Sequence, residues 1–326
     1  MMEVEEQIRL KDVVIEFSQR TKILKTHFIR AVNEISLSIS KGEILALVGE
    51  SGCGKTTLGR ATLKLIPISN GQIIFKGIDV TNSKESELNW FRNQAQMIFQ
   101  DPYSSIDPFM SVREILEEPL KIHRIDLDKE QLITSSLESV RLVPVADYLS
   151  KFPHMLSGGQ RQRLAIARAL ILRPSYLFAD EPVSMIDASS RAEILGLLLK
   201  IRNEQDFSCL YVTHDIATVS HFADRVAVMY QGKLVEIGTP SEVIESPLHP
   251  YTKALIESVP EPDPSNKSKY RGGIQGESPN PNNVPSGCSF HPRCPQAIRG
   301  QCDVFSPELI SQGQNRLVSC HLYSGT

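Results

Sequence analysis

An eight-residue glycine-rich loop constrains this chain more than any other feature. It reads Gly49-Glu50-Ser51-Gly52-Cys53-Gly54-Lys55-Thr56 and follows the continuously apolar run at 44–48, which is typical of a buried parallel strand. The form G-x-x-x-x-G-K-[ST] lets backbone N–H groups surround a phosphate, while the following helix N-terminus adds partial positive charge. Lys55 would neutralise phosphate oxygens and the Thr56 hydroxyl would ligate Mg²⁺, with Thr57 completing the predicted nucleotide site. A chance match is on the order of one in a hundred, so we expect a phosphate-binding loop in an α/β fold.

Two adjacent carboxylates end a second apolar run. The run at 176–179 is followed directly by Asp180 and Glu181. A buried strand delivers such acids to the carboxyl edge of a sheet, where ligands bind in folds of this kind. We expect Asp180 to hold Mg²⁺, directly or through water, and Glu181 to polarise the water that attacks the γ-phosphate. Because acids commonly end strands, the pair indicates this role only together with the phosphate loop.

Composition and charge exclude several other classes of protein. Of the 326 residues, 41% are hydrophobic and 22% are charged, close to ordinary globular usage. The balance of 35 basic and 38 acidic side chains gives a net charge of −3, so no nucleic-acid partner is indicated. No apolar run approaches the roughly 18 residues of a membrane span, and the acidic start lacks a signal-peptide core. We therefore expect a globular protein that stays on the cytoplasmic side.

The segment Leu156-Ser157-Gly158-Gly159-Gln160 carries the most specific signal. Ser157 followed three residues later by Gln160 has the form of a capping box that opens a helix. The two glycines leave the first N–H groups of that helix uncovered. The segment matches LSGGQ, the signature of the ABC-transporter ATPases, and it lies between the phosphate loop and the acidic strand. The chain therefore resembles that family.

The resemblance implies catalytic roles for two further residues beside Glu181. Gln100, in the segment 96–102, matches the Q-loop of the family, which reaches Mg²⁺ and the attacking water and links the site to the helical subdomain. His214, in the segment 211–215, matches the switch histidine that contacts the γ-phosphate. A lone histidine after a strand is more often a surface or core group, so only the alignment of motifs supports this role.

Two more positions are matched through the same resemblance. Asp187 matches the D-loop, although Met185-Ile186 stands where the family more often has Ala-Leu. Phe17 matches the aromatic side chain that stacks on adenine. Phe28 is its rival for that role, and the alternative for Phe17 is a position in a strand core.

The family mechanism implies two ATPase subunits that share each nucleotide. In this family, ATP lies between the phosphate loop of one subunit and the LSGGQ helix of the other, so residues 157–160 would act on the nucleotide of a partner. Lys55 and Mg²⁺ only partly neutralise the four negative charges of ATP, and a second helix N-terminus completes the shell and excludes water. ATP would then join the subunits, and hydrolysis would release them.

Four further segments resemble the oligopeptide/dipeptide importers of this family. They are residues 99–108, where relatives usually end in Leu-Asn-Pro, and residues 180–184, 249–255 and 276–295. The resemblance implies a peripheral subunit at the cytoplasmic membrane face, with two transmembrane permease subunits and an extracytoplasmic solute-binding protein. The segment 158–161 resembles the "F"-type ATPase, so a heterodimer with a second homologous ATPase is expected over a homodimer. Relatives also carry nickel or oligosaccharides, and both solutes stay as alternatives to di- and oligopeptides.

The predicted fold class is α/β, a P-loop NTPase with a RecA-like parallel sheet core. An N-terminal antiparallel β-subdomain, a helical signature subdomain and a C-terminal Cys-containing extension complete it. Residues 1–250 would form the ATPase domain, with the helical subdomain at about 102–160, and residues 251–326 the extension. The stretch 88–156 has a mainly helical pattern, and the proline-rich stretch 260–286 is predicted to be an extended connector.

Four of the six cysteines lie near the end of the chain: Cys288, Cys294, Cys302 and Cys320. Structural disulfides are not expected in a cytosolic chain. The spacing matches neither the paired C-x-x-C of zinc ribbons nor a ferredoxin run, and four thiolates suit zinc or an iron–sulfur cluster equally on count. Some members of the family hold a [4Fe–4S] cluster here, so the resemblance favours that cluster over zinc or unliganded thiols.

Three functions of other classes compete with a transporter ATPase. Soluble ABC ATPases of translation or DNA repair typically fuse two cassettes or insert long coiled coils, and this chain does neither. A GTP-dependent switch needs Asn-Lys-x-Asp, whereas Asn266-Lys267-Ser268-Lys269 lacks the acid. A regulatory ATPase without turnover is disfavoured because both Glu181 and His214 are present.

Overall fold

The computed structural model describes residues 5–22, 25–258, 276, 284–313 and 315–324. Contacts divide the chain into two compact units. The first unit comprises residues 1–8, 38–43 and 74–211, and the second comprises residues 9–37, 44–73 and 212–326. The connector predicted at 260–286 lies almost wholly outside the described residues.

The second unit contains the apolar strand that precedes the phosphate loop. This strand, β3 (Ile44–Val48), is buried at every position and pairs in parallel with β9 (Arg225–Tyr230). Next to β9 lies the antiparallel strand β10 (Lys233–Gly238), and the order in this unit is β11-β12-β10-β9-β3. The outer strands β11 (Ile310–Ser311) and β12 (Leu317–Val318) come from the C-terminal extension. The prediction of a buried parallel strand at 44–48 is confirmed.

Long strands at the start of the chain form a second sheet. In the second unit their order is β2-β1-β4, with β1 at Glu6–Lys22, β2 at Lys25–Ser40 and β4 at Asn70–Phe75. In the first unit β4 pairs antiparallel with β5 (Ile78–Asp79). Ile35, Leu37 and Ile39 are buried while Ser36 is exposed. The alternating pattern at 35–39 therefore marks one buried face of β2, as the period of two requires.

The first unit holds the strand that carries the two carboxylates. This strand, β7 (Tyr176–Asp180), is buried throughout and pairs in parallel with β6 (Ala95–Ile98). The strand order is β8-β7-β6, with β8 at Ser208–Thr213. The strand at 95–98 interrupts a stretch whose pattern is mainly helical. Pairing with β7 decides the structure of this run, because four residues are too few for local preference to impose a helix.

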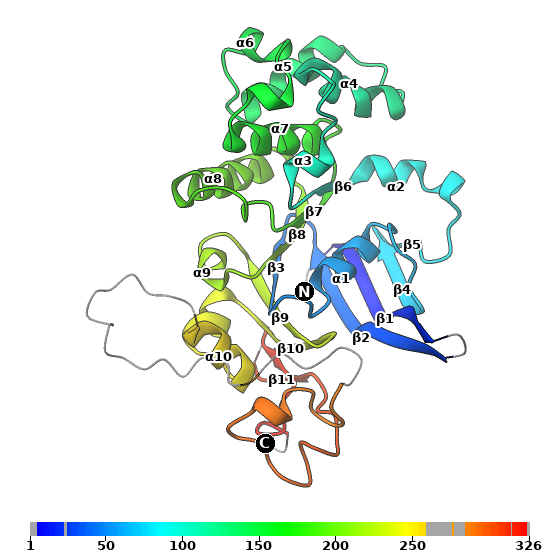
Figure 1. Cartoon of the computed structure of the whole chain (residues 1–326), viewed down its shortest axis with the longest axis vertical. Helices are drawn as coiled ribbons and strands as arrows, with labels where there is room; N and C mark the ends of the chain where they lie inside the picture. Colours follow the sequence, from blue (N-terminus) through cyan, green and yellow to red (C-terminus); the bar gives the residue numbers. More distant parts are fainter. Residues whose placement is uncertain (1–4, 23–24, 259–275, 277–283, 314, 325–326) are drawn as a thin grey trace, which may run out of the picture. The chain divides into compact units, whose positions relative to one another are not determined.

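Helices make up most of the remaining described part of the first unit (Figure 1). They are α2 (Asn89–Gln94), α3 (Pro102–Ser105), α4 (Val112–Ile122), α5 (Lys129–Ser139), α6 (Ala146–Leu149), α7 (Gly158–Leu170) and α8 (Ala188–Gln205). Helix α7 packs against β6, α3, α4 and α5. Ile115, Leu116 and Leu120 are buried on α4. Ile122, which shares their spacing, is 64% exposed because α4 ends there.

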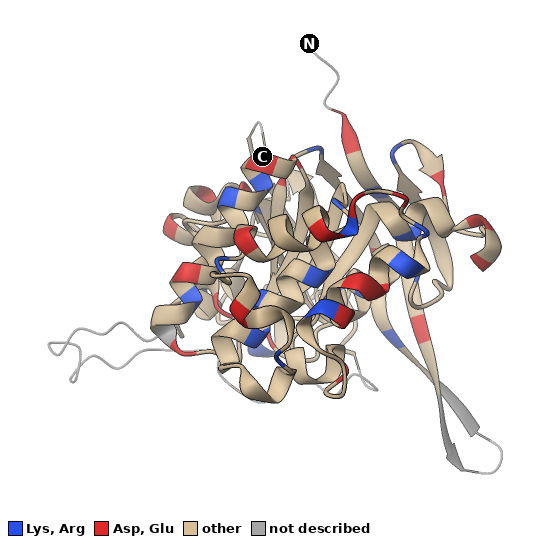
Figure 2. Ribbon diagram, turned by 90° about the horizontal axis from the view of Figure 1, so that it is seen from above, with Lys and Arg blue, Asp and Glu red and all other residues tan. Residues whose placement is uncertain are grey.

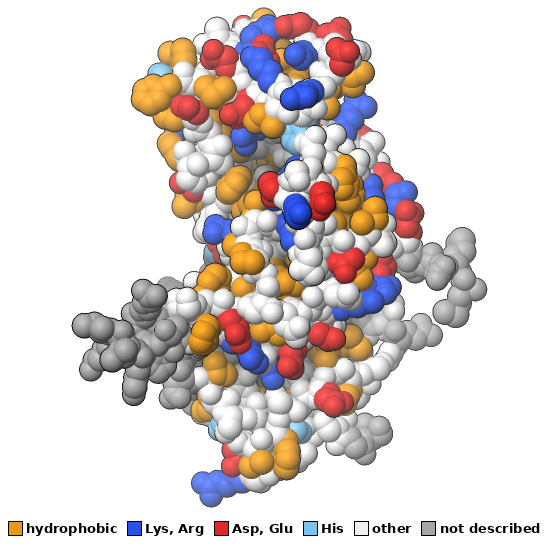
Figure 3. All heavy atoms as spheres, turned by 90° about the vertical axis from the view of Figure 1, so that its right-hand side faces the viewer, with side chains coloured by type: hydrophobic (Ala, Val, Ile, Leu, Met, Phe, Trp, Pro, Cys, Tyr) orange, Lys and Arg blue, Asp and Glu red, His pale blue; other side chains and the backbone are white. Residues whose placement is uncertain are grey.

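The second unit has short helices beside its sheet: α1 (Lys55–Thr62), α9 (Ile216–Val219) and α10 (Pro250–Glu257). In the parts of the chain that the structure describes, every helix is too short or too polar to cross a membrane. Basic and acidic residues follow one another along the helices of the ribbon in Figure 2. In Figure 3, side chains of both charges are mixed over the helical end of the visible face. Charge of one sign therefore does not distinguish these surfaces.

Candidate functional site

The predicted site residues divide between the two units. The second unit holds Phe17, the phosphate loop at 49–57 and His214. The first unit holds Gln100, Asp180, Glu181, the signature at 157–160 and Asp187. Each unit thus carries one group of candidate residues with its own internal geometry.

The phosphate loop joins the end of β3 to the start of α1, as the motif predicts. Gly54 is the N-cap of α1 and has φ 106°, which favours glycine. A Cβ on Gly54 would lie 2.2 Å from the carbonyl oxygen of Ala31. A Cβ on Gly49 would lie 2.2 Å from the carbonyl oxygen of Met229. Both glycines are therefore required by close backbone approach, and the loop has the cradle shape that suits a phosphate.

Lys55 lies over this loop rather than in solvent. Its ammonium donates hydrogen bonds to the carbonyls of Gly49 and Glu50, both at 2.8 Å, and its residue is only 5% exposed. Cys53 is also buried, and burial raises the pKa of its thiol. Thr56 and Thr57 are half-buried in the first turn of α1. The loop therefore combines a fixed cation, a protonated thiol and two hydroxyls at one helix start.

Sequence reasoning missed two residues that hold the phosphate loop from the C-terminal side of the chain. The backbone N–H of Glu50 donates to the Tyr251 hydroxyl at 2.8 Å, and the Glu50 carboxylate forms an ion pair with Arg293 at 2.9 Å. Tyr251 lies on α10, and Arg293 lies in a 3₁₀ turn at His291–Arg293. No spacing rule joins residues so far apart in the sequence, so local patterns hold no signal for either contact.

The aromatic and histidine candidates of the second unit are accessible. Phe17 is 45% exposed on β1, and Phe28 is 68% exposed on β2. The alternative of a core position for Phe17 is therefore wrong, and both rings have a free surface on which a base could stack. His214 follows β8 and is exposed.

In the first unit, strand register brings Gln100 to Glu181. Ile98 of β6 lies opposite Ala179 of β7. Gln100 follows Ile98 by two residues, and Glu181 follows Ala179 by two residues. The Gln100 side-chain amide donates to the Glu181 carboxylate at 3.1 Å. Asp180 is 3% exposed at the last position of β7. This edge therefore presents two carboxylates and an amide, a donor set that suits Mg²⁺ and a polarised water.

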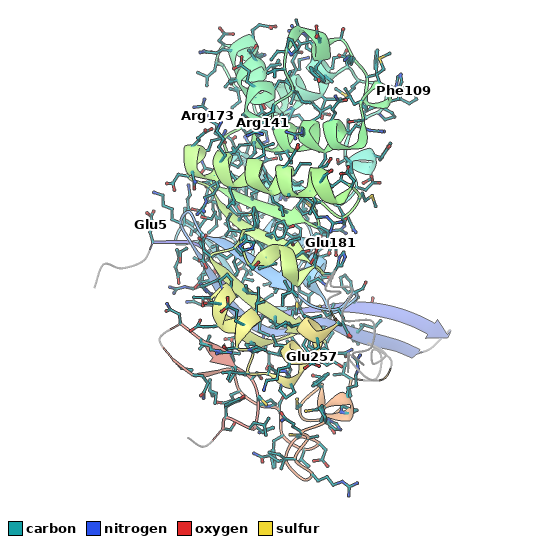
Figure 4. All side chains as sticks on the ribbon, turned by 90° about the vertical axis from the view of Figure 1, so that its left-hand side faces the viewer. Glu5, Phe109, Arg141, Arg173, Glu181 and Glu257 are labelled. Carbon is teal, nitrogen blue, oxygen red and sulfur yellow. The ribbon has the colours of Figure 1, made fainter. Side chains whose placement is uncertain are left out.

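The backbone at Glu181 makes a sharp turn at the end of β7, where Figure 4 labels it. Its φ of 44° is unusual for a residue with a side chain. The Ser184 N–H and hydroxyl both donate to the Glu181 carbonyl, at 3.1 and 3.0 Å. These bonds hold the turn in a conformation that costs free energy of about 1 kcal/mol.

The signature segment caps helix α7, as predicted. The Gln160 N–H donates to the Ser157 hydroxyl at 3.3 Å, and the Ser157 N–H donates to the Gln160 side-chain oxygen at 2.9 Å. Ser157 and Gly158 are exposed, and a Cβ on Gly158 would meet nothing within 4 Å. The start of α7 is thus ordered by its own cap and open on the outside, an arrangement in which helix N-termini attract anions.

Asp187 begins helix α8 as its N-cap. Its carboxylate accepts hydrogen bonds from the Ser189 hydroxyl and from the Ser190 N–H, the latter at 2.9 Å. These bonds hold the pKa of Asp187 well below its usual value. The D-loop residue is therefore ionised and oriented by the helix that it caps.

The cysteines of the extension do not form the metal site that the resemblance led us to expect. All four are described as free thiols, and within the described residues no three His, Cys, Asp or Glu side chains are grouped to hold a metal ion. Burial raises the pKa of the Cys288 and Cys294 thiols, and it raises that of Cys320 to about 11. The described residues therefore give no support to the iron–sulfur cluster that the resemblance favours.

Comparison with known protein families matches two segments of the chain. Residues 32–184 match the model "ABC transporter". Residues 235–302 match "Oligopeptide/dipeptide transporter, C-terminal region". The first match includes the phosphate loop, the signature and both carboxylates, and the second includes Tyr251 and Arg293.

Curated relatives cover nearly the whole chain. The "Putative oligopeptide transport ATP-binding protein YkfD" of Bacillus subtilis is 43% identical over 95% of each chain. The "Oligopeptide transport ATP-binding protein AppF" of the same species is 41% identical over 97% of each chain. Among solved structures, the "ATP-binding cassette MJ0796 bound to ADP and Pi", a dimer, has a TM-score of 0.64 and 26% identity over 72% of this chain and 98% of that one.

Proposed function

This chain belongs to the ATP-binding subunits of oligopeptide/dipeptide ABC transporters, and from that premise we propose that it energises the import of di- and oligopeptides. It is an ATP hydrolase of the ABC cassette fold. The observation that supports the choice of solute is the match of residues 235–302 to the family "Oligopeptide/dipeptide transporter, C-terminal region". The domain division into 1–250 and 251–326 stays a prediction.

In the second unit, the phosphate loop binds the triphosphate. Backbone N–H groups of residues 49–54 surround the phosphates, because the glycine positions leave room for close approach. Lys55, already held over the loop, neutralises phosphate oxygens. His214 contacts the γ-phosphate, and Phe17 stacks on adenine, with Phe28 as the alternative ring.

In the first unit, Glu181 acts as the general base for the attacking water. The hydrogen bond that the Gln100 amide donates to Glu181 at 3.1 Å supports a role for Gln100 in orienting the carboxylate and the water. Of the residues proposed to hold Mg²⁺, Gln100 and Asp180 lie in this unit and Thr56 lies in the second unit. The ion would supply neutralisation of phosphate charge. The buried position of Asp180 keeps its carboxylate in one orientation.

The signature residues serve a second ATPase subunit, and we assign that subunit to a related chain. The start of α7 carries the signature residues Ser157, Gly158, Gly159 and Gln160. Ser157 and Gly158 are exposed, and among the described residues a Cβ on Gly158 would meet nothing within 4 Å. An exposed helix N-terminus stabilises phosphate charge on a partner's nucleotide. Asp187, ionised and fixed as a helix cap, takes part in the same contact between subunits.

Two permease subunits dock on the helical segment between Gln100 and Ser157, at the cytoplasmic face of the membrane. A solute-binding protein delivers the peptide outside. Large apolar side chains are exposed on this segment. Phe109 is 88% exposed, Tyr103 61% and Met155 58%. Phe109 lies at the outer edge of the helices in Figure 4. Apolar side chains of this kind are typical of the centre of a protein interface.

The substitution Glu181→Gln tests this mechanism. Removing a general base lowers the rate of ATP hydrolysis by about 10²–10⁴-fold, while ATP binding continues. The ATPase subunits should therefore accumulate as an ATP-bound dimer. ATP turnover and ATP-dependent gel filtration measure both effects. Glu204→Gln is the matched control, since it neutralises an exposed carboxylate on α8. Hydrolysis near the control rate would remove Glu181 as the base.

A separate experiment tests the solute. Cells that lack this chain should lose uptake of a labelled tripeptide and recover it when the chain is restored. Uptake of a labelled oligosaccharide and of Ni²⁺ is measured in the same cells. Loss of either of these with normal tripeptide uptake would contradict the assignment of peptides.

A further inference from the structure

The C-terminal extension contacts the phosphate loop through a charged residue, and we propose that Arg293 is a positioning residue that makes this loop receptive to ATP. Arg293 neutralises Glu50, the second residue of the loop, and fixes its side chain. This inference rests on the proposed role of the loop in binding the triphosphate. It assigns to the extension a part in nucleotide binding rather than in attachment alone.

The ion pair has the geometry of a specific contact. The two terminal nitrogens of Arg293 donate to the two carboxylate oxygens of Glu50 at 2.9 and 3.1 Å. The Arg293 side chain is only 6% exposed and that of Glu50 22%. A two-point guanidinium–carboxylate contact with little solvent is stronger and more directional than a surface ion pair. Arg293 thus holds Glu50 in one orientation.

Further contacts fix Arg293 itself. Its guanidinium also donates to the Tyr230 hydroxyl at 3.3 Å and to the Gly276 carbonyl at 3.2 Å. The rings of Tyr230, Tyr251 and Phe290 pack together with centroids 4.5–5.4 Å apart. This aromatic cluster joins β9, α10 and the extension, so it gives Arg293 a rigid support.

The same cluster also holds the loop backbone. The Glu50 N–H donates to the hydroxyl of Tyr251, and the Glu50 carbonyl accepts from Lys55, both at 2.8 Å. The N–H, the carbonyl and the carboxylate of one loop residue are therefore each held by a different side chain. Preorganised loops bind their ligands more tightly, because less conformational entropy is lost on binding.

Charge explains why Arg293 matters for ATP in particular. A carboxylate on a loop that receives a tetra-anion opposes binding, and the opposition grows where water is scarce. Pairing with Arg293 removes this opposition. Loss of the Arg293 charge would remove the guanidinium that neutralises the largely buried Glu50 carboxylate on the loop. Loss of both charges would remove that carboxylate as well.

This reasoning predicts an ordered series of ATP affinities. Arg293→Gln should raise the dissociation constant for ATP about ten-fold, because the Glu50 carboxylate would then oppose the charge of the triphosphate. Glu50→Gln should bind ATP at least as tightly as the unmodified chain. The double variant should bind more tightly than Arg293→Gln alone. Arg299→Gln, at an exposed position of the same extension, is the matched control.

Titration of the full chain with a fluorescent ATP analogue measures these affinities. In steady-state kinetics of the assembled transporter, Arg293→Gln should show a raised KM for ATP with little change in kcat. A purely structural clamp would instead make the double variant no better than Arg293→Gln. That result, or an affinity of Arg293→Gln within about two-fold of the control, overturns the inference. If Arg293→Gln does not fold, Arg293→Lys is the deciding variant. A lysine keeps the charge but loses the two-point contact, so it should weaken ATP binding about three-fold. An ATP affinity of Arg293→Lys equal to that of the unmodified chain overturns the inference.

Lys55→Ala separates this inference from the proposed function. If Lys55→Ala loses ATP binding while the Arg293 series does not follow the predicted order, only the role of Arg293 fails. If Lys55→Ala binds ATP normally, the loop itself is not the nucleotide site, and the proposed function fails first.

Discussion

Within the second unit, a buried ion pair attaches the extension to β10, and its removal gives a sharp test of how this unit is stabilised. Glu236 of β10 is fully buried, and Arg316, just before β12, donates to its carboxylate at 2.7 Å. The backbone N–H groups of Leu248 and His249 donate to the same carboxylate, both at 2.9 Å. We predict that Arg316→Met destabilises the packing of β12 and the start of α10 on β10.

The magnitude follows from these contacts. Removal of one partner of a buried pair costs about 3–5 kcal/mol, because the other charge stays buried. Glu236 keeps two backbone donors, so we expect the lower value, about 3 kcal/mol. This corresponds to an increase of about a hundred-fold in the population of the locally opened state. The double variant Glu236→Gln/Arg316→Met should regain part of the loss, because neither charge remains.

Native-state hydrogen exchange measures this effect locally, without the assumption that the chain unfolds in one step. The amides of Leu248 and His249 should exchange about a hundred-fold faster in Arg316→Met. Arg299→Met is the control, since it removes an exposed arginine of the same extension. Exchange within about three-fold of the control would refute the reasoning, as would a double variant less protected than Arg316→Met.

Two more predictions concern pH and the phosphate loop. Burial lowers the pKa of His249 to about 3. Between that value and the usual histidine pKa of about 6.5, only the unfolded chain binds the proton. The free energy of unfolding should therefore fall by up to about 1.4 kcal/mol for each unit by which the pH is lowered. Unfolding measured at pH 7.5 and pH 5 should show a smaller loss for His249→Asn, and equal losses would contradict the assignment. Gly54→Ala should abolish ATP binding because its Cβ would lie 2.2 Å from the Ala31 carbonyl. Gly77→Ala, which also has positive φ but open space, should keep ATP binding, and ATP binding by Gly54→Ala would show that the loop tolerates a side chain.

Local patterns predicted the parts of the fold that depend on neighbouring residues. The apolar run at 44–48 became a buried strand, and the Ser157–Gln160 spacing became the cap of α7. The run before Asp180 became β7. Each of these depends on period, capping or burial over a few residues, and such preferences act within the segment itself.

Other features of the structure could not be predicted from the sequence, because they depend on contacts between residues far apart in the chain. The strand at 95–98 forms only through pairing with β7. The count and spacing of the four cysteines left the ligand undecided, and the structure shows free thiols that are not grouped for a metal. Where a thiol lies depends on how the extension folds, which the spacing alone does not determine.

The sequence by itself determined that the chain carries a phosphate loop, an acidic strand end and a signature helix, since each motif is a continuous segment with its own conformational preference. Only the tertiary structure decided that Gln100 contacts Glu181 across 81 residues and that Arg293 pairs with Glu50 across 243. The physical reason is that strand register and the docking of the extension bring these groups together, and both are set by burial of surfaces from distant parts of the chain.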